Sequence, residues 1–166
     1  MTQQIVVQPL TEEAFSKYGK IIRIEPDQEP LADNEALVYW EKMVEFEPDI
    51  PRTIGLLTEK RREMVLTQME RHQKAKEWFV PVSGECVACF AEYHDPDDDA
   101  EVPQPDKVVA FKMDNIVGFV VHRGAWHWPA FPITPTATQL VNLRRDTEHD
   151  DVDVKELSER VEIVLS

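Results

Sequence analysis

Histidine and carboxylate side chains gather in the stretch MERHQKAKEWFVPVSGE, residues 69–85. Glu70 and His72 lie two positions apart, and Glu77 follows His72 by five positions. Side chains two positions apart on a β-strand leave the same face of the sheet. Imidazole nitrogens and carboxylate oxygens both bind divalent transition ions, so this stretch could supply several ligands to one ion.

Two further histidines, His122 and His127, lie in HRGAWHWPAFP, residues 122–132. If His127 faces the same space as the three residues above, two nitrogen and two oxygen donors can surround one ion and leave positions open for substrate. These donors do not choose among nickel, manganese, iron and zinc. The alternative is that the histidines are core residues bonded to backbone and the glutamates are solvated. The combined spacing favours a shared site.

The elements that must position these residues are expected to be β-strands. Five stretches rich in β-branched or aromatic residues follow one another closely, which favours an all-β barrel or sandwich. They are MVLTQMERH, EWFVPVSGE, CVACFAEYH, KVVAFKM and VGFVVH. The β-prone runs KIIRI and ALVYWEKMVEF precede them. Two short helices are expected beside the strands, one over residues 11–18, from Thr11 as N-cap to Gly19 as C-cap, and one over residues 154–160.

Two further motifs have a structural explanation. HDPDDDAEVPQPD, residues 94–106, combines acids with prolines and predicts an exposed excursion between two strands. A calcium loop is the alternative, but the stretch lacks the glycine and distal glutamate of an EF-hand. Cys86 and Cys89 have the C-x-x-C spacing of redox pairs and zinc sites, yet on a strand they would point to opposite faces. Buried reduced thiols are therefore the favoured interpretation.

Length and composition limit the classes of protein to consider. The chain has 166 residues, and we expect a single domain over residues 1–166. The net charge of −14 would repel a phosphate backbone, so nucleic acid is not an expected partner. No apolar run reaches the ~20 residues of a membrane span, and the N-terminus lacks the pattern of a signal peptide. We expect a cytoplasmic protein with no membrane partner.

The spacing around Glu77 resembles the first motif of the cupin family, which marks two strands of a small β-barrel. The pattern here is Glu70-x-His72, four residues, Glu77, six residues and Gly84, with a carboxylate in place of the motif's first histidine. HRGAWH resembles the second cupin motif. Longer segments, namely LTEEAFSKYGKII, MERH to VPVSGE, VVHRGAWHWPAF and LVNLRRDTEHDDVDV, resemble the ureidoglycolate lyase family, whose members have a cupin fold.

This resemblance implies a cupin-like β-barrel, that is, a double-stranded β-helix with one or two short peripheral helices. It also implies a homodimer that takes a small-molecule substrate and releases urea and glyoxylate from ureidoglycolate. A divalent metal ion such as nickel is associated with the family, and manganese, zinc and iron stay open here. On this resemblance His72, Glu77 and His127 would bind the ion, which would lower the pKa of the substrate's hydroxyl.

The implied reaction needs a base and an acid. A base removes the hydroxyl proton, the C–N bond breaks as the carbonyl forms, and an acid protonates the departing nitrogen. His122 and Glu70 are the expected catalytic residues, since a free imidazole titrates near neutral pH. Arg123 is the expected partner of the substrate carboxylate if it faces the cavity. Arg71 should point away from Glu70 and His72 into a structural salt bridge.

The chain departs from the family pattern at three positions. Trp128 follows His127 where the family usually has a second histidine, Glu59 stands near a position where the family tends to have an arginine, and Glu77 replaces a glutamine found in some relatives. Trp126 and Trp128 should lie on the face opposite His127. These departures leave two alternatives, a cupin that binds a small acid without catalysis and a cupin enzyme for another small 2-hydroxy or ureido acid.

Overall fold

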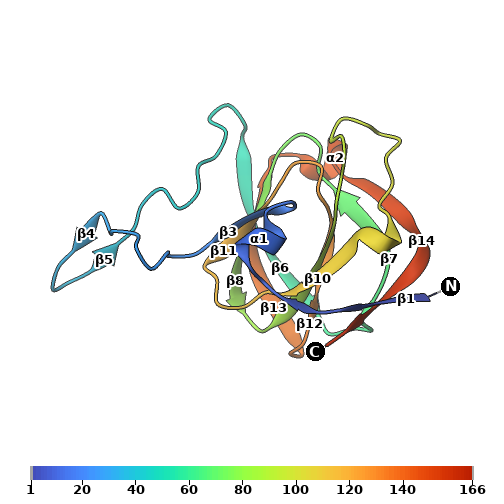
Figure 1. Ribbon diagram of the computed structural model, residues 1–166. Coiled ribbons are helices and arrows are strands. Elements are labelled where there is room, and N and C mark those ends of the chain that lie inside the picture. Colours follow the sequence, from blue (N-terminus) through green and yellow to red (C-terminus); the bar gives the residue numbers. More distant parts are fainter. Residues whose placement is uncertain (1, 166) are drawn as a thin grey trace.

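Two β-sheets pack face to face and nearly close into a barrel (Figure 1). The computed structural model describes residues 2–165. In spatial order the larger sheet consists of β1 (Thr2–Val6), β14 (Asp153–Val164), β7 (Val65–Arg71), β12 (Trp126–Pro132), β9 (Cys86–Ala91), β10 (Val108–Lys112) and β2 (Gln8–Pro9). The smaller sheet consists of β3 (Gly19–Ile22), β11 (Gly118–Val121), β8 (Glu77–Ser83), β13 (Thr136–Arg144) and β6 (Arg52–Lys60). The expected all-β, barrel-like fold is confirmed.

The five stretches that predicted strands form β7 to β11, and each pairs with a neighbour in its sheet. Most pairs are antiparallel, and the parallel pairs are β1 with β14 and β2 with β10. Gly84, after β8, has a φ of 79°, and a Cβ there would lie 2.3 Å from the carbonyl oxygen of Thr136. Glycine is therefore required at this turn, as the sequence motif predicted.

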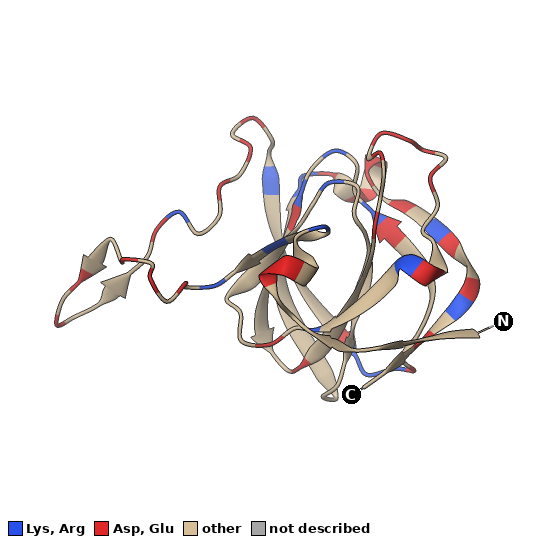
Figure 2. Ribbon diagram, viewed as in Figure 1, with Lys and Arg blue, Asp and Glu red and all other residues tan. Residues whose placement is uncertain are grey.

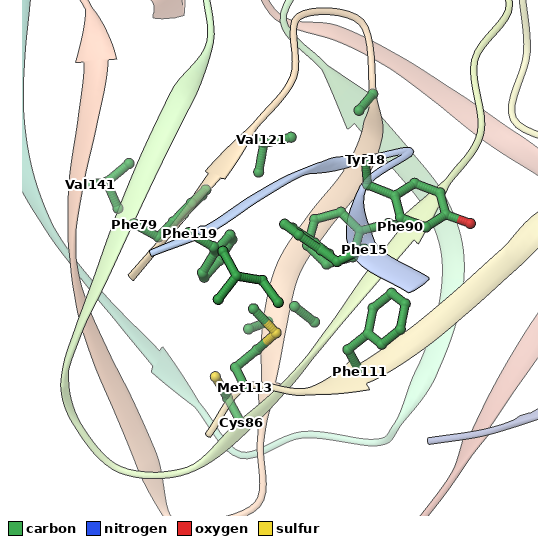
Figure 3. Close-up of a cluster of buried hydrophobic side chains, with 14 of the residues drawn as sticks. Phe15, Tyr18, Phe79, Cys86, Phe90, Phe111, Met113, Phe119, Val121 and Val141 are labelled. Atoms are coloured by element: carbon green, nitrogen blue, oxygen red, sulfur yellow. The ribbon is translucent and has the colours of Figure 1, made fainter. Parts of the chain in front are cut away.

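An aromatic cluster fills the space between the two sheets (Figure 3). Phe15 is fully buried, and its ring meets those of Phe90, Phe111 and Phe119 edge-on at centroid distances of 5.1 to 6.0 Å. Edge-on pairs of this kind add to the stabilisation that burial of the rings provides. Because the cluster draws on both sheets, it fixes the two sheets against each other.

Phe15 comes from α1 (Glu12–Phe15), which is shorter than the predicted helix over residues 11–18. The N-cap is confirmed, because the Thr11 side chain accepts a hydrogen bond from the amide of Ala14. The predicted C-cap is wrong: Gly19 begins β3, and a Cβ there would lie 1.9 Å from the Val120 carbonyl oxygen. Close approach to β11 explains this glycine.

The predicted helix over residues 154–160 is also wrong. These residues belong to β14, which pairs with β7 on one side and with β1 on the other. Two short helical turns that the sequence did not indicate are α2 (Thr147–Asp150), just before β14, and η1 (Pro105–Lys107). The count of short helices in the fold is nevertheless as expected, since α1 and α2 are the two α-helices of residues 2–165.

Residues 23–51 leave the barrel as an arm (Figure 1). Within it, β4 (Ala32–Asp33) pairs with β5 (Val38–Tyr39). The run ALVYWEKMVEF was expected to be a strand, but only its residues Val38–Tyr39 form one. Residues 42–47 return from the arm and pack beside β8, where Phe46 contacts Trp78 at a centroid distance of 5.7 Å.

Two smaller expectations, on the cysteines and on the acidic stretch, are met. Cys86 and Cys89 are buried free thiols. Residues 94–101 form an acidic, largely exposed loop, and Lys and Arg alternate with acids along β14 (Figure 2). Among residues 2–165, no helix has the length and apolar character needed to cross a membrane.

Candidate active site

Three of the predicted residues meet near one end of the barrel. Glu70 is on β7, His72 follows that strand, and His127 is on β12, directly paired with Glu70. One donor atom from each lies within 4.8 Å of the others. The sequence expectation that Glu70 and His72 share a face is therefore confirmed. His72 and His127 are buried, whereas Glu70 is partly exposed.

Glu77, the first residue of β8, brings a second carboxylate to this cluster from the opposite sheet. Its Oε2 lies 3.0 Å from Nε2 of His127 and 3.5 Å from Nε2 of His72. Burial alone would raise the pKa of Glu77, but attraction to the two imidazoles lowers it to about 2. Burial likewise opposes the charged form of His72, but the Glu77 carboxylate raises that pKa to about 9.

The backbone orients both imidazole rings. Nδ1 of His72 donates to the carbonyl oxygen of Asp151 at 2.6 Å, and Nδ1 of His127 donates to that of Ala125 at 3.0 Å. In the neutral rings this leaves the Nε2 lone pairs facing Glu77, which is the arrangement of metal-binding histidines. Within residues 2–165, neither Nε2 of His127 nor Oε2 of Glu77 makes a hydrogen bond of good geometry. These buried atoms and the mixed N and O donor set fit a divalent transition ion.

A cavity of about 50 Å³ extends from the cluster into the barrel. Glu70, Glu77 and His127 form its polar end, and most of its remaining wall is apolar. Trp128 is also among its lining residues, and it packs against the core cluster that contains Trp126. The pairing of β12 with β9 is regular from Trp126 to Trp128 and shifts register only between Trp128 and Phe131. Trp126 is buried in the core as expected.

His122 does not join the cluster. It lines a separate cavity of about 300 Å³, beneath residues 42–47, together with Lys20, Arg52 and Lys76. Among the described residues that line these two cavities, Glu77 alone lines both. Burial and the charge of Lys76 lower the pKa of His122, so the imidazole is neutral near neutral pH. Its position outside the cluster does not support the direct catalytic role expected from sequence.

The two arginines of the motifs bind acidic partners. Arg123 donates to the carboxylate of Asp97 in the acidic loop at 2.7 Å and to the carbonyl oxygen of Gln73, and it lines neither cavity. Its position thus does not support the expected role of binding the substrate carboxylate. Arg71 is fully buried and forms ion pairs with Asp153 and Glu101, as expected.

Sequence reasoning missed the buried Gln139 on the inner wall and noted the buried Glu59 only as a departure from the family. Gln139, on β13, lines the inner cavity, and Glu59, on β6, holds its amide group. The signal was present in TATQLVNL, where Gln139 falls between Ala137 and Val141 on the inward face of the strand. A polar residue at an inward position of a strand is a candidate for contact with a ligand.

A model of the ureidoglycolate lyase family matches residues 2–164. A ureidoglycolate lyase of Pseudomonas savastanoi pv. phaseolicola is 27% identical over 168 residues, which cover 98% of this chain and 95% of the relative. The corresponding protein of Stutzerimonas stutzeri is 30% identical over 134 residues, covering 78% of this chain and 76% of the relative. That of Pseudomonas syringae pv. syringae is 25% identical over 169 residues, covering 98% and 95%.

Proposed function

The chain belongs to the ureidoglycolate lyase family, and we propose that its barrel interior cleaves ureidoglycolate into urea and glyoxylate. The observation that carries this proposal is the convergence of Glu70, His72, Glu77 and His127 beside the inner cavity. Glu70, Glu77 and His127 line a largely apolar pocket, with His72 beside them, and a few polar side chains in an apolar pocket are the usual composition of a small-molecule site.

We propose that His72, His127 and Glu77 hold a divalent metal ion, with nickel, manganese, zinc and iron as the candidates. When bound, such an ion lowers the pKa of a coordinated hydroxyl group. Glu77 is the better carboxylate ligand because it is buried and reaches both imidazoles, at 3.0 and 3.5 Å. Glu70 stays available for proton transfer, since it lines the same cavity and is less buried.

The reaction moves one proton from oxygen to nitrogen without net addition of water. In the proposed order of steps, Glu70 first accepts the proton of the substrate hydroxyl. The electron pair of the O–H bond then forms the carbonyl as the C–N bond breaks. Glu70 then returns the proton to the departing urea nitrogen. Apolar walls around the cavity exclude water, which strengthens the electrostatic interactions inside it.

The test combines activity with metal content. Purified protein supplied with each candidate ion should release urea and glyoxylate from ureidoglycolate above the uncatalysed rate. His72→Ala and His127→Ala should lose bound ion and reduce turnover by at least about 100-fold. His94→Ala is the matched control, because that histidine is exposed and belongs to neither group of potential metal ligands among the described residues. Binding of ureidoglycolate without any turnover would instead favour a binding protein without catalysis.

We also propose that two copies of the chain associate. The outer face of the smaller sheet exposes Ile54 and Leu56, each 68% exposed, beside Leu140 of the neighbouring strand. The arm exposes further apolar side chains, including Leu31 and Tyr39. Apolar surface gathered on one sheet face and one projecting arm is typical of a subunit interface.

A further inference from the structure

A buried amide group faces the inner cavity from the wall formed by β13 and β6. Gln139 is 2% exposed, and its Nε2 donates to both carboxylate oxygens of Glu59, at 3.2 and 3.4 Å. Glu59 is 5% exposed and is itself anchored, because its Oε1 accepts the backbone N–H of Ala130 at 2.7 Å. The carboxylate therefore has a fixed position on the barrel wall.

This anchoring fixes the orientation of the Gln139 amide. A carboxylate accepts hydrogen bonds, so the NH₂ group of Gln139 must face Glu59 and the carbonyl oxygen Oε1 must face elsewhere. Within residues 2–165, Oε1 is buried without a donor. A buried acceptor without a partner is unfavourable, so each such atom in a native protein calls for an explanation, such as a bound water, ion or ligand.

The cavity wall limits which ligand can supply the missing donor. Beside Gln139 the wall consists largely of apolar side chains such as Leu57, Phe79 and Phe119. Burial raises the pKa of the Glu59 carboxyl, but the N–H donors of Gln139 and Ala130 favour its charged form, which repels a ligand carboxylate from this end of the cavity. The other end holds Glu70, Glu77 and His127, where the ion of the proposed function would attract a ligand carboxylate. A ligand that carries both a carboxylate and an amide thus has one favourable direction of entry.

We infer that Gln139 is a specificity residue that accepts a hydrogen bond from the terminal NH₂ of a ureido group, while the ligand's carboxylate points toward His72 and His127. This inference rests on the proposed function, and it also explains Glu59. The Glu59 carboxylate orients the Gln139 amide, and that amide recognises the ureido end of the substrate. Glu59 itself makes no contact with the substrate's acid group.

Two unreactive ligands test the inference directly. Hydantoate has the ureido and carboxylate groups of ureidoglycolate but lacks the hydroxyl, and N-acetylglycine differs from hydantoate only by a methyl group in place of the terminal NH₂. The protein is used as purified, with the metal that it retains. In calorimetric titrations, hydantoate should bind to it at least about 10-fold more tightly than N-acetylglycine does. Methyl substitution leaves the acceptor of Gln139 unpaired and so weakens binding.

Substitution of Gln139 should remove this preference. Gln139→Met keeps the length of the side chain but has no carbonyl oxygen, so the ratio of the two affinities should fall to about one. Asn142→Leu is the matched control, because Asn142 is a buried amide on the same strand that bonds Arg52 on the outer face. It should retain the wild-type ratio.

The preference of the wild-type protein does not depend on whether a variant folds. Equal affinity of the wild type for the two ligands, or no detectable binding of hydantoate, would overturn the inference, as would an unchanged ratio in Gln139→Met. Failure of the proposed function looks different. In that case ureidoglycolate is not turned over, while the preference for hydantoate and its loss in Gln139→Met persist.

Discussion

At the scale of single residues, the cluster depends on which proton each side chain carries. Without a bound metal ion, the Glu77 carboxylate raises the pKa of His72 to about 9, against an ordinary value of 6.5. A raised pKa means that this ion pair contributes its full stability below pH 6.5 and loses it as the pH rises through 9. Metal binding requires the neutral imidazole and therefore competes with this proton.

The pKa of His72 leads to a measurable proton release. At pH 7.5, binding of Ni²⁺ or Zn²⁺ should release about one proton per ion, and this release should disappear above pH 9, where His72 is already neutral. Calorimetric titration in buffers of different ionisation enthalpy measures the proton count. His72→Gln should bind the ion weakly and release no such proton. Tight ion binding at pH 7.5 with no proton release would contradict this assignment.

Sequence spacing predicted that Glu70, His72, Glu77 and His127 converge, but it did not place every side chain around them. Glu70 and His72 could be placed together because they are two positions apart on one strand. His122 could not be excluded, since the turn at Gly124, with φ of 85°, separates it from the strand that carries His127. Arg123 could not be placed either, because its partner Asp97 comes from a loop that has no regular pattern.

At the scale of elements, Arg71 joins β7 to β14 and to the acidic loop. Its guanidinium lies 4.5 Å from the ring of Trp126, donates to Asp153 at 2.9 Å and to the Asp98 carbonyl oxygen at 2.6 Å, and pairs with Glu101. Arg71 thus holds three segments around the strand that carries Glu70. Since Arg71 is fully buried, these contacts are not screened by solvent.

Removal of Arg71 should therefore destabilise the fold. Arg71→Ala leaves two carboxylates without their partner and should lower the free energy of unfolding by about 3–5 kcal/mol. Arg160→Ala is the control, because Arg160 pairs with Glu63 on the surface, and it should change stability by less than about 1 kcal/mol. Urea unfolding of the two variants measures the difference. A loss for Arg71→Ala no larger than that for the control would show that the buried network is energetically neutral.

The strands of the barrel were predictable, whereas the C-terminal element was not. Leu157 and Val161 lie four positions apart, a spacing that places two side chains on one face of a helix and equally on one face of a strand. Local sequence therefore cannot decide between the two. The choice is made by pairing with β7 and β1, which lie far away along the chain.

At the scale of the whole molecule, two of the places where the described residues expose large apolar side chains can contribute to an interface. One is the outer face of β6, with Ile54 and Leu56, and the other is the arm. In a monomer both apolar surfaces stay exposed to water, which does not stabilise the fold. A two-fold pair of chains can bury both if each covers the other, and a stable interface needs about 800 Å² per partner.

The oligomeric state is thus a test of the whole-molecule arrangement. Light scattering should give a mass twice that of the 19.2 kDa chain for the wild type. Ile54→Asp with Leu56→Asp places two charges on the outer face of β6 and should shift the protein to monomers, because each buried charge without a partner costs several kcal/mol. Val102→Asp, at a 47% exposed residue that directly follows the acidic loop, should leave the dimer intact. A wild-type mass of one chain would refute the proposed association. A dimer that survives the double substitution would place the interface elsewhere, because the outer face of β6 cannot bury two carboxylates without weakening the contact.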